Sequence, residues 1–195
     1  MAQAGLRERS KARRRAAIIR AAFELFAERG YDATTVADIA EAAEVAPRTV
    51  SMYFPAKQDI AMSRLGDGVA SLTAAIQDRQ PGETVHEVFG RWLLASQTDP
   101  EDRELYRLAR RMFAANPDLA ALRTARIAAA IREGAAAIAA DTGSAPGAIG
   151  PRIAAAAAAA ITMEIIDTEP GPEREEAVAV AMRFLDGGTA ALYGA

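Results

Sequence analysis

Residues 34–57 read TTVADIAEAAEVAPRTVSMYFPAK, a stretch whose pattern predicts two short helices joined by a turn. Apolar residues recur at helical spacing between Val36 and Ala43, which predicts a short amphipathic helix. Thr35 and Asp38 fit a capping box, in which each side chain satisfies a backbone N–H group at the start of the helix. We therefore expect a helix that begins directly after Thr35.

A second helix is predicted after a short turn. Pro47 suits the first position of a helix, where its missing N–H group costs nothing, and Pro55 ends that helix. Val50 and Phe54 are four residues apart and are expected to face inward. The outward face then carries Arg48, Thr49, Ser51 and Met52. Two short helices joined by a tight turn, the second with a polar outer face, are typical of a helix-turn-helix DNA-binding element.

An ordinary helical hairpin without a ligand would show the same periodicity, so the neighbouring charges matter. Residues 1–20 carry seven Lys and Arg residues against the single acidic residue Glu8. Such a segment can follow a phosphate backbone or reach a minor groove. Basic runs also occur on solvated helix faces and in tails, and this alternative stays open.

Residues 16–60 resemble the DNA-binding domain of the TetR family of bacterial repressors. The most specific parts are the run FAERGYDATT, which begins at Phe26, and the run YFPAK, which begins at Tyr53. The resemblance covers roughly a quarter of the chain. It implies an all-α fold, with an N-terminal three-helix helix-turn-helix DNA-binding domain and a C-terminal helical domain for ligand binding and dimerisation.

The resemblance also implies domain boundaries and functional residues. The DNA-binding domain is expected over residues 1–57, with the helix-turn-helix at about 36–55, and the second domain over 58–195. Phosphate contacts are expected from Thr35, Tyr53 and Lys57. Contacts with bases or backbone are expected from Pro47, Arg48, Thr49, Ser51 and Met52.

Two positions depart from the family pattern. Ala46 stands where a Ser or Thr cap is usual, so the second helix is expected to lack a side-chain cap worth about 1 kcal/mol. Ser51 stands where a Tyr is common. The second departure bears on the DNA sequence that is recognised rather than on DNA binding itself.

Composition and charge are compatible with this interpretation. The chain has no Cys, which excludes disulfides and thiolate metal sites, and its single His makes a zinc site unlike the usual ones. No charge-free apolar run reaches about 20 residues, and no signal-peptide core is present, so we expect a cytoplasmic protein without a membrane segment. Residues 1–60 hold ten basic against eight acidic residues, whereas the remainder holds thirteen against eighteen. A basic N-terminal part and an acidic remainder suit a protein that places one end on DNA, although so small a difference in charge also arises by chance.

Beyond Lys57 the pattern is helical throughout. Residues 57–80 are expected to form one long helix that links the two domains, and residues 142–151, rich in Gly, Ser and Pro, are expected to form a loop. Further helices are expected over 84–97, 100–116, 119–140, 153–168 and 173–192.

The last two helices are candidates for a dimer interface. Residues 153–166 are mostly Ala, which allows helices to approach closely, and the final helix is rich in large apolar residues. The resemblance implies that these helices pair with those of a second copy, and an operator with two half-sites needs a two-fold protein. Packing within one monomer is the alternative.

The resemblance further implies a small-molecule pocket in the C-terminal domain. Its candidate lining residues are Phe89, Trp92, Tyr106, Phe113 and Met163, although apolar residues at helical spacing more often form core. No cofactor or metal is expected. The expected function is a DNA-binding regulator, a dimeric repressor that a small-molecule effector releases from a palindromic, double-stranded operator.

Two other classes of protein, an enzyme and a helical adaptor, are alternatives to a regulator. An enzyme is disfavoured because the sequence contains no Gly-rich phosphate loop, no Cys nucleophile and no Ser elbow motif. Acid–base chemistry by carboxylates leaves no sequence signature and stays open. A helical adaptor for protein partners would lack the steep salt dependence of DNA binding.

Overall fold

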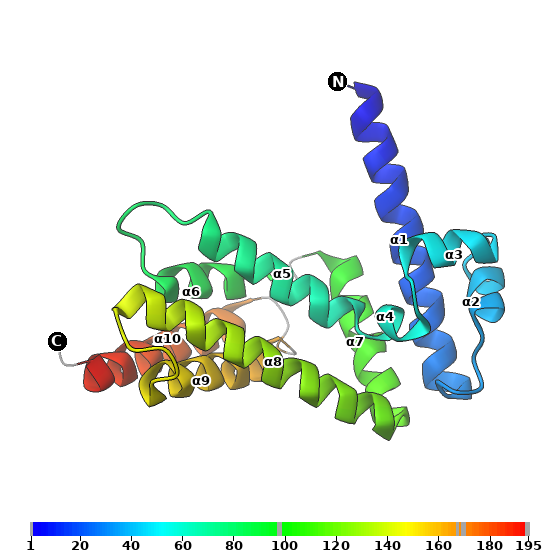
Figure 1. Ribbon diagram of the computed structural model, residues 1–195. Helices are drawn as coiled ribbons and strands as arrows, with labels where there is room; N and C mark the ends of the chain where they lie inside the picture. The colour runs from blue at the N-terminus through cyan, green and yellow to red at the C-terminus, as the bar shows by residue number, and fades with distance from the viewer. Residues whose placement is uncertain (1, 97–98, 167, 169–170, 194–195) are drawn as a thin grey trace. The chain divides into compact units, whose positions relative to one another are not determined.

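The computed structural model describes residues 2–96, 99–166, 168 and 171–193, and every regular element in these ranges is a helix (Figure 1). This confirms the predicted all-α class. The ten helices are α1 (Ala2–Arg29), α2 (Val36–Ala42), α3 (Pro47–Tyr53), α4 (Lys57–Ala61), α5 (Ser63–Gln77), α6 (Val85–Ala95), α7 (Pro100–Ala115), α8 (Pro117–Thr142), α9 (Ile149–Ile165) and α10 (Pro172–Tyr193).

These helices form two compact units. The first unit contains the residues up to Asp67 together with Glu101–Arg123, and the second contains Gly68–Pro100 and the residues from Thr124 onward. The first unit is larger than the segment 1–57 predicted to bind DNA, because α7 supplies part of its core. Helices α5 and α8 contribute residues to both units.

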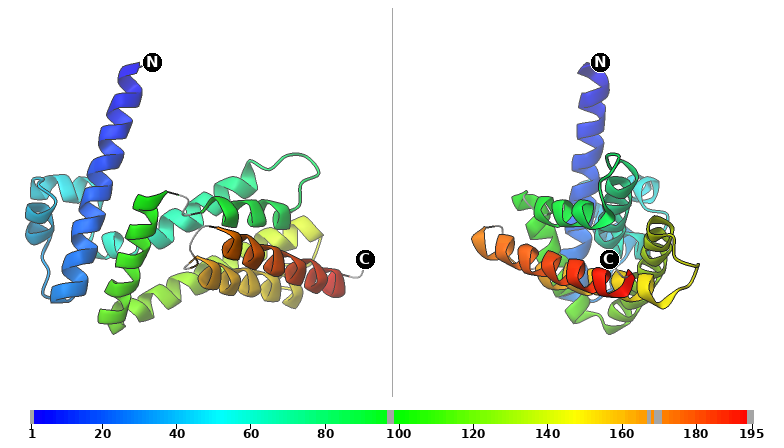
Figure 2. Two further views of the ribbon diagram at one scale, coloured as in Figure 1. Left: turned by 180° about the vertical axis from the view of Figure 1, so that it is seen from behind. Right: turned by 90° about the vertical axis from the view of Figure 1, so that its left-hand side faces the viewer.

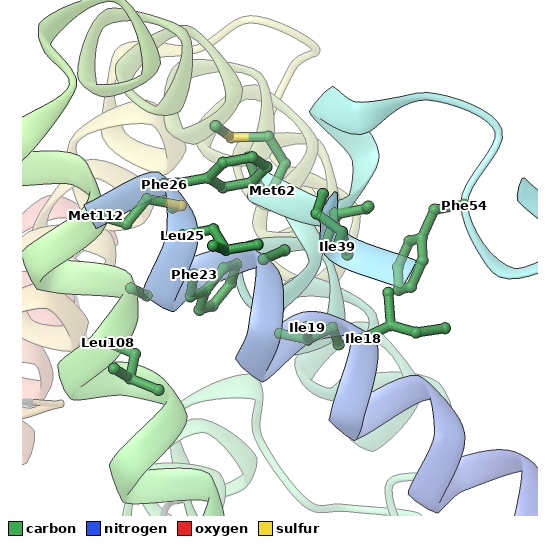
Figure 3. Close-up of a cluster of buried hydrophobic side chains, with 14 of the residues drawn as sticks. Ile18, Ile19, Phe23, Leu25, Phe26, Ile39, Phe54, Met62, Leu108 and Met112 are labelled. Carbon is green, nitrogen blue, oxygen red and sulfur yellow. The ribbon is translucent and has the colours of Figure 1, made fainter. Parts of the chain in front are cut away.

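The core of the first unit is built on the C-terminal half of α1. Ile18, Phe23 and Phe26 are fully buried there, and they recur at the spacing of one helix face. Figure 3 shows Ile18 next to the ring of Phe54, which follows α3, whereas α7 brings Met112 to the other side of the cluster. The single cluster therefore fixes α2 and α3 against a scaffold made by α1 and α7.

The prediction of one long helix over residues 57–80 is wrong, because the chain forms two helices, α4 and α5, with a break at Met62. Four successive residues, Ile60 to Ser63, are all buried. A continuous helix turns about 100° per residue, so four successive side chains cannot all face one core. The turn at Met62 resolves this conflict and lets each of the four side chains pack inward.

The predicted loop over 142–151 is also shorter than expected, because α9 begins at Ile149 rather than at Ile153. Pro151 lies in the first turn of this helix, where backbone N–H groups have no partner inside the helix. The proline is therefore compatible with a helix start and does not mark the end of the loop. Of the other predicted helix ends, Gln97 lies outside the described residues, and Thr168 lies beyond the end of α9 at Ile165.

In the second unit, α10 packs against α9 and α6, and the left view of Figure 2 shows α10 beside α9. The two helices α6 and α10 approach closely because Gly90 has no side chain. A Cβ atom at that position would lie 3.0 Å from the sulfur of Met182. The Phe89 and Trp92 rings stack with their centroids 6.1 Å apart on the same helix.

A buried arginine ties this unit together. Arg174 is only 2% exposed, and its guanidinium donates to the carbonyl oxygens of Leu93 at 2.8 Å and Thr168 at 3.0 Å. It thereby satisfies carbonyl groups at the end of α6 and in the connection that precedes α10. Within the described ranges, none of the helices has the length and apolar character needed to cross a membrane.

Candidate nucleic-acid interface

Helix α2 begins with the capping box that the sequence predicts. The Asp38 backbone N–H group donates to the Thr35 hydroxyl oxygen at 3.1 Å, and the Thr35 hydroxyl and backbone N–H groups both donate to the Asp38 carboxylate at 2.7 Å. The hydroxyl bond and then the backbone bond lower the pKa of Asp38 below its ordinary value. Thr35 itself is exposed, so its position permits a contact with a phosphate.

The turn between α2 and α3 is a Schellman motif. The N–H group of Glu44 donates to the Glu41 carbonyl at 3.1 Å, and that of Val45 donates to the Ala40 carbonyl at 2.9 Å. Glu44 adopts a left-handed conformation with φ of 53°, a position where glycine is usual. The motif fixes the direction in which the chain leaves α2, and it therefore fixes the angle of α3.

One face of helix α3 packs against the core of the first unit, and the opposite face is exposed. Val50 is 1% exposed and Phe54 is buried beside it, so both belong to the core of the first unit. Pro47 occupies the start of the helix, and Ala46 provides no side-chain cap, as predicted. The residues left exposed on this short helix are Pro47, Arg48, Ser51 and Met52, with Thr49 and Tyr53 half-buried.

The exposed face of α3 has the chemistry of a base-reading surface. Arg48 offers a planar guanidinium, which matches the O6 and N7 acceptors of guanine in the major groove. Met52 is 77% exposed, which is unusual for a large apolar side chain, and it lies one helical turn from Arg48. An apolar group in that position suits the methyl group of thymine. The Ser51 hydroxyl makes a long bond of 3.4 Å to the Pro47 carbonyl and is accessible to solvent.

Lys57 has a structural role in addition to any contact with phosphate. Its ammonium group donates to the carbonyl oxygens of Tyr31 at 2.6 Å and Thr34 at 2.9 Å, and it lies 4.1 Å from the centre of the Tyr31 ring. Two of its three N–H groups therefore hold the turn between α1 and α2. The third N–H group can donate to a phosphate.

The same turn is also held by Asn116, which sequence reasoning missed. The Asn116 side chain accepts from the Tyr31 N–H group at 2.7 Å and donates to the carbonyls of Phe26 at 2.8 Å and Met112 at 2.7 Å. The buried hydroxyl of Thr34 donates to the Gly30 carbonyl at 2.8 Å. No local sequence signal announces Asn116, because its partners lie as many as 90 residues away.

The residues predicted to line an effector pocket are divided between the two units. Phe89 and Trp92 belong to the apolar cluster of the second unit, where Met163 is about half-exposed. Phe113 lies in the core of the first unit, and Tyr106 belongs to the same unit, with its ring centre 4.6 Å from the Arg64 guanidinium. Burial, the largest influence, raises the pKa of Tyr106.

The second unit contains a partly open cavity of about 550 Å³ between α6 and α10. Its lining is mainly apolar, with one basic and one acidic residue, and comprises Gly90, Leu94, Gly171, Arg174, Glu175, Val178, Ala179 and Met182. This volume lies within the range of small-molecule sites. Among the described residues, no group of three or more His, Asp or Glu side chains is arranged to hold a metal ion.

Comparisons with known proteins agree with the geometry of the first unit. Residues 18–62 match the family model for bacterial regulatory proteins of the tetR family. The chain is 43% identical over 79 residues to the HTH-type transcriptional regulator TcmR of Streptomyces glaucescens. This match covers 40% of the chain and 35% of TcmR, so the chain spans about a third of the length of that curated relative.

Solved structures show the same fold over nearly the whole chain. GusR of Salmonella enterica matches with a TM-score of 0.62 and 20% identity, over 90% of this chain and 95% of GusR. NalD, the secondary repressor of the MexAB-OprM multidrug efflux pump in Pseudomonas aeruginosa, matches with a TM-score of 0.56 and 20% identity, over 90% of this chain and 96% of NalD. At 20% identity the two structures show a shared fold and no more, whereas the family model matches the helix-turn-helix itself.

Proposed function

We propose that this chain, a transcriptional regulator of the TetR family, is a dimeric repressor that a small molecule releases from its operator. The observation that carries the proposal is the face of α3. This helix is anchored by buried Val50 and Phe54, and it presents Arg48 and Met52 to solvent on a rigid support. A short helix held in this way can enter the major groove with its side chains directed at base edges.

The contacts with phosphates and the contacts with bases come from different residues. Thr35, Tyr53 and Lys57 lie around the helix-turn-helix with hydroxyl and ammonium groups, which suit phosphate oxygens, and they position the protein on the duplex. Arg48 and Met52 read base pairs, with Pro47, Thr49 and Ser51 beside them. In this assignment, loss of a phosphate contact weakens binding to all sequences, whereas loss of Arg48 relaxes the choice at one base pair.

Dimerisation through α9 and α10 is supported by apolar side chains that these helices leave in solvent. Ile153 and Met163 of α9 are about half-exposed, as is Val180 of α10, and Phe184 of α10 is 65% exposed. Val180 and Phe184 lie one turn apart on the same face. A second copy of the chain would cover this surface, and it would supply the second α3 that a two-fold operator requires.

The effector site is assigned to the second unit, at the cavity beside α6 and α10. The Phe89 and Trp92 pair lies on α6, the same helix that lines this cavity. A ligand releases the operator only if it binds the non-binding conformation more tightly, and typical coupling energies are about 1–3 kcal/mol. We assign no catalytic role to the chain, since its distinctive side chains are accounted for by DNA recognition and packing.

The proposal is tested by selecting double-stranded DNA from a random pool with the purified protein. The expected result is enrichment of an inverted repeat whose half-sites are separated by about one helical turn, roughly 10 base pairs. Binding to the selected sequence should weaken steeply as salt increases. If no motif is enriched over the starting pool, the chain is not a sequence-specific DNA-binding protein.

A further inference from the structure

Residues 7–14 extend α1 without contributing a buried side chain that would explain the length or the charge of this segment. Figures 1 and 2 show it extending well beyond α3, and no described side chain in residues 7–17 is buried. Five exposed basic residues lie in this segment, against Glu8 alone on the acidic side: Arg7, Arg9, Lys11, Arg13 and Arg14. The helix rises about 1.5 Å per residue, so Arg7 lies about 12 Å beyond Arg15.

Arg15 fixes the direction in which this segment leaves the first unit. Its guanidinium donates to both carboxylate oxygens of Asp67, at 2.8 and 2.9 Å, and it lies 5.3 Å from the centre of the Phe54 ring. Phe54 immediately follows α3. The basic segment therefore begins beside the end of the helix that we propose to read DNA, and a two-point ion pair holds it there.

The basic residues fall on two different faces of α1. Arg7, Lys11 and Arg14 are separated by four and three residues, and the same spacing continues to Ile18. Ile18 packs next to Phe54 (Figure 3), so this stripe faces the side of α1 on which α3 lies. Arg9 and Arg13 are about half a turn away, on the opposite face.

This segment is unfavourable for an isolated helix. Positive charges near a helix N-terminus oppose the helix dipole, and like charges four residues apart repel each other. The first turn contains no acidic residue that would compensate. A polyanion along the stripe would offset the repulsion between these charges, and DNA bound to α3 would bring its phosphate backbone to that side.

We propose that Arg7, Lys11 and Arg14 form a second DNA-contacting element, which binds the phosphate backbone next to the site read by α3. The inference rests on the proposed DNA-binding function and adds a surface outside the helix-turn-helix. Because phosphates are the same in every sequence, the stripe raises affinity without changing the base sequence that is preferred. Arg9 and Arg13 contact no phosphate in this arrangement.

The test compares two matched double variants on the operator obtained by selection. Arg7→Gln/Lys11→Gln alters the stripe, and Arg9→Gln/Arg13→Gln removes the same number of charges, at the same spacing, from the opposite face. Each phosphate contact contributes about 0.9 to the slope of log affinity against log salt. A dimer loses four contacts in the stripe variant, so its slope should fall by about 3.6. Between 50 and 200 mM salt, the stripe variant should then lose about 150-fold less affinity than the wild type.

The control variant should keep the wild-type slope, and the selected consensus sequence should be the same for all three proteins. Equal slopes in the wild type and the stripe variant would overturn the inference, as would an equal decrease in both variants, which would indicate only a diffuse charge effect. Circular dichroism checks that both variants keep the wild-type helix content. If the wild-type protein enriched no motif, both the proposed function and the role of the stripe would be refuted. Failure of the proposed function is therefore distinguishable from failure of the stripe alone.

Discussion

Replacing Asn116 with alanine should destabilise the first unit by about 3 kcal/mol. The Asn116 side chain is 8% exposed and makes three hydrogen bonds, to the Tyr31 N–H group and to the carbonyls of Phe26 and Met112. Each such bond contributes about 1 kcal/mol net, and a buried N–H group left without a partner costs about 1–3 kcal/mol. Loss of the two bonds that Asn116 donates to carbonyls costs about 2 kcal/mol, and the part-buried Tyr31 N–H group, left without its acceptor, adds about 1 kcal/mol, which gives about 3 kcal/mol.

Urea denaturation followed by circular dichroism measures this loss. Thr162→Ala serves as a control, because the Thr162 hydroxyl donates only to the Ala158 carbonyl in its own helix, at 2.8 Å, and its loss should cost about 1 kcal/mol or less. Asn116→Asp is a sharper variant. It keeps an acceptor for Tyr31 but turns a carboxylate oxygen toward two carbonyl oxygens, so it should be destabilised at least as much at neutral pH. If Asn116→Ala lost no more stability than Thr162→Ala, the buttressing role of Asn116 would be refuted.

Four further perturbations test other parts of the account. Glu44→Gly should stabilise the protein by up to about 1 kcal/mol in thermal unfolding, because glycine adopts the left-handed conformation without strain, and a loss of stability would contradict the Schellman turn. The pKa of Asp38 is lowered in the folded protein, so its carboxylate stabilises the fold above the unfolded pKa of about 3.9, and this contribution disappears as the pH falls through the folded pKa. The loss of stability caused by Asp38→Asn should therefore shrink between pH 6 and pH 3. A loss that stays constant with pH would show that ionisation of Asp38 does not stabilise the fold. Phe184→Glu should convert the dimer into a monomer in sedimentation velocity, whereas Ala137→Glu, on an exposed part of α8, should remain dimeric. Arg48→Ala should weaken operator binding by about 1–3 kcal/mol and relax selection at one base pair per half-site, and a uniform loss over all operator variants would rule out base reading.

The helix-turn-helix was predictable from the sequence because its determinants are local. The Thr35–Asp38 capping box, Pro47 at a helix start and the four-residue spacing from Val50 to Phe54 all act within one or two helical turns. Each of these features was found at the expected position. Rules of this kind do not depend on which distant segments pack against the helix.

The features that were missed depend on distant partners. Asn116 and Arg174 act through carbonyl groups far away in the sequence, and neither residue belongs to a recognisable motif. The helix over 100–116 was predicted, but the sequence could not show that Phe113 would join the core of the first unit rather than line a pocket. The break at Met62 arises from the same cause, because four successive buried residues require a core on more than one side.

We expect α3 to lie in the major groove with Arg48 at a guanine. Methylation interference tests it most directly, because dimethyl sulfate methylates guanine N7, which lies in the major groove, and adenine N3, which lies in the minor groove. We predict interference by guanine methylation in two patches about one helical turn apart on the selected operator. In Arg48→Ala the interference should disappear at one guanine per half-site and persist at the others. Interference confined to adenine N3, or a wild-type pattern unchanged in Arg48→Ala, would contradict the account.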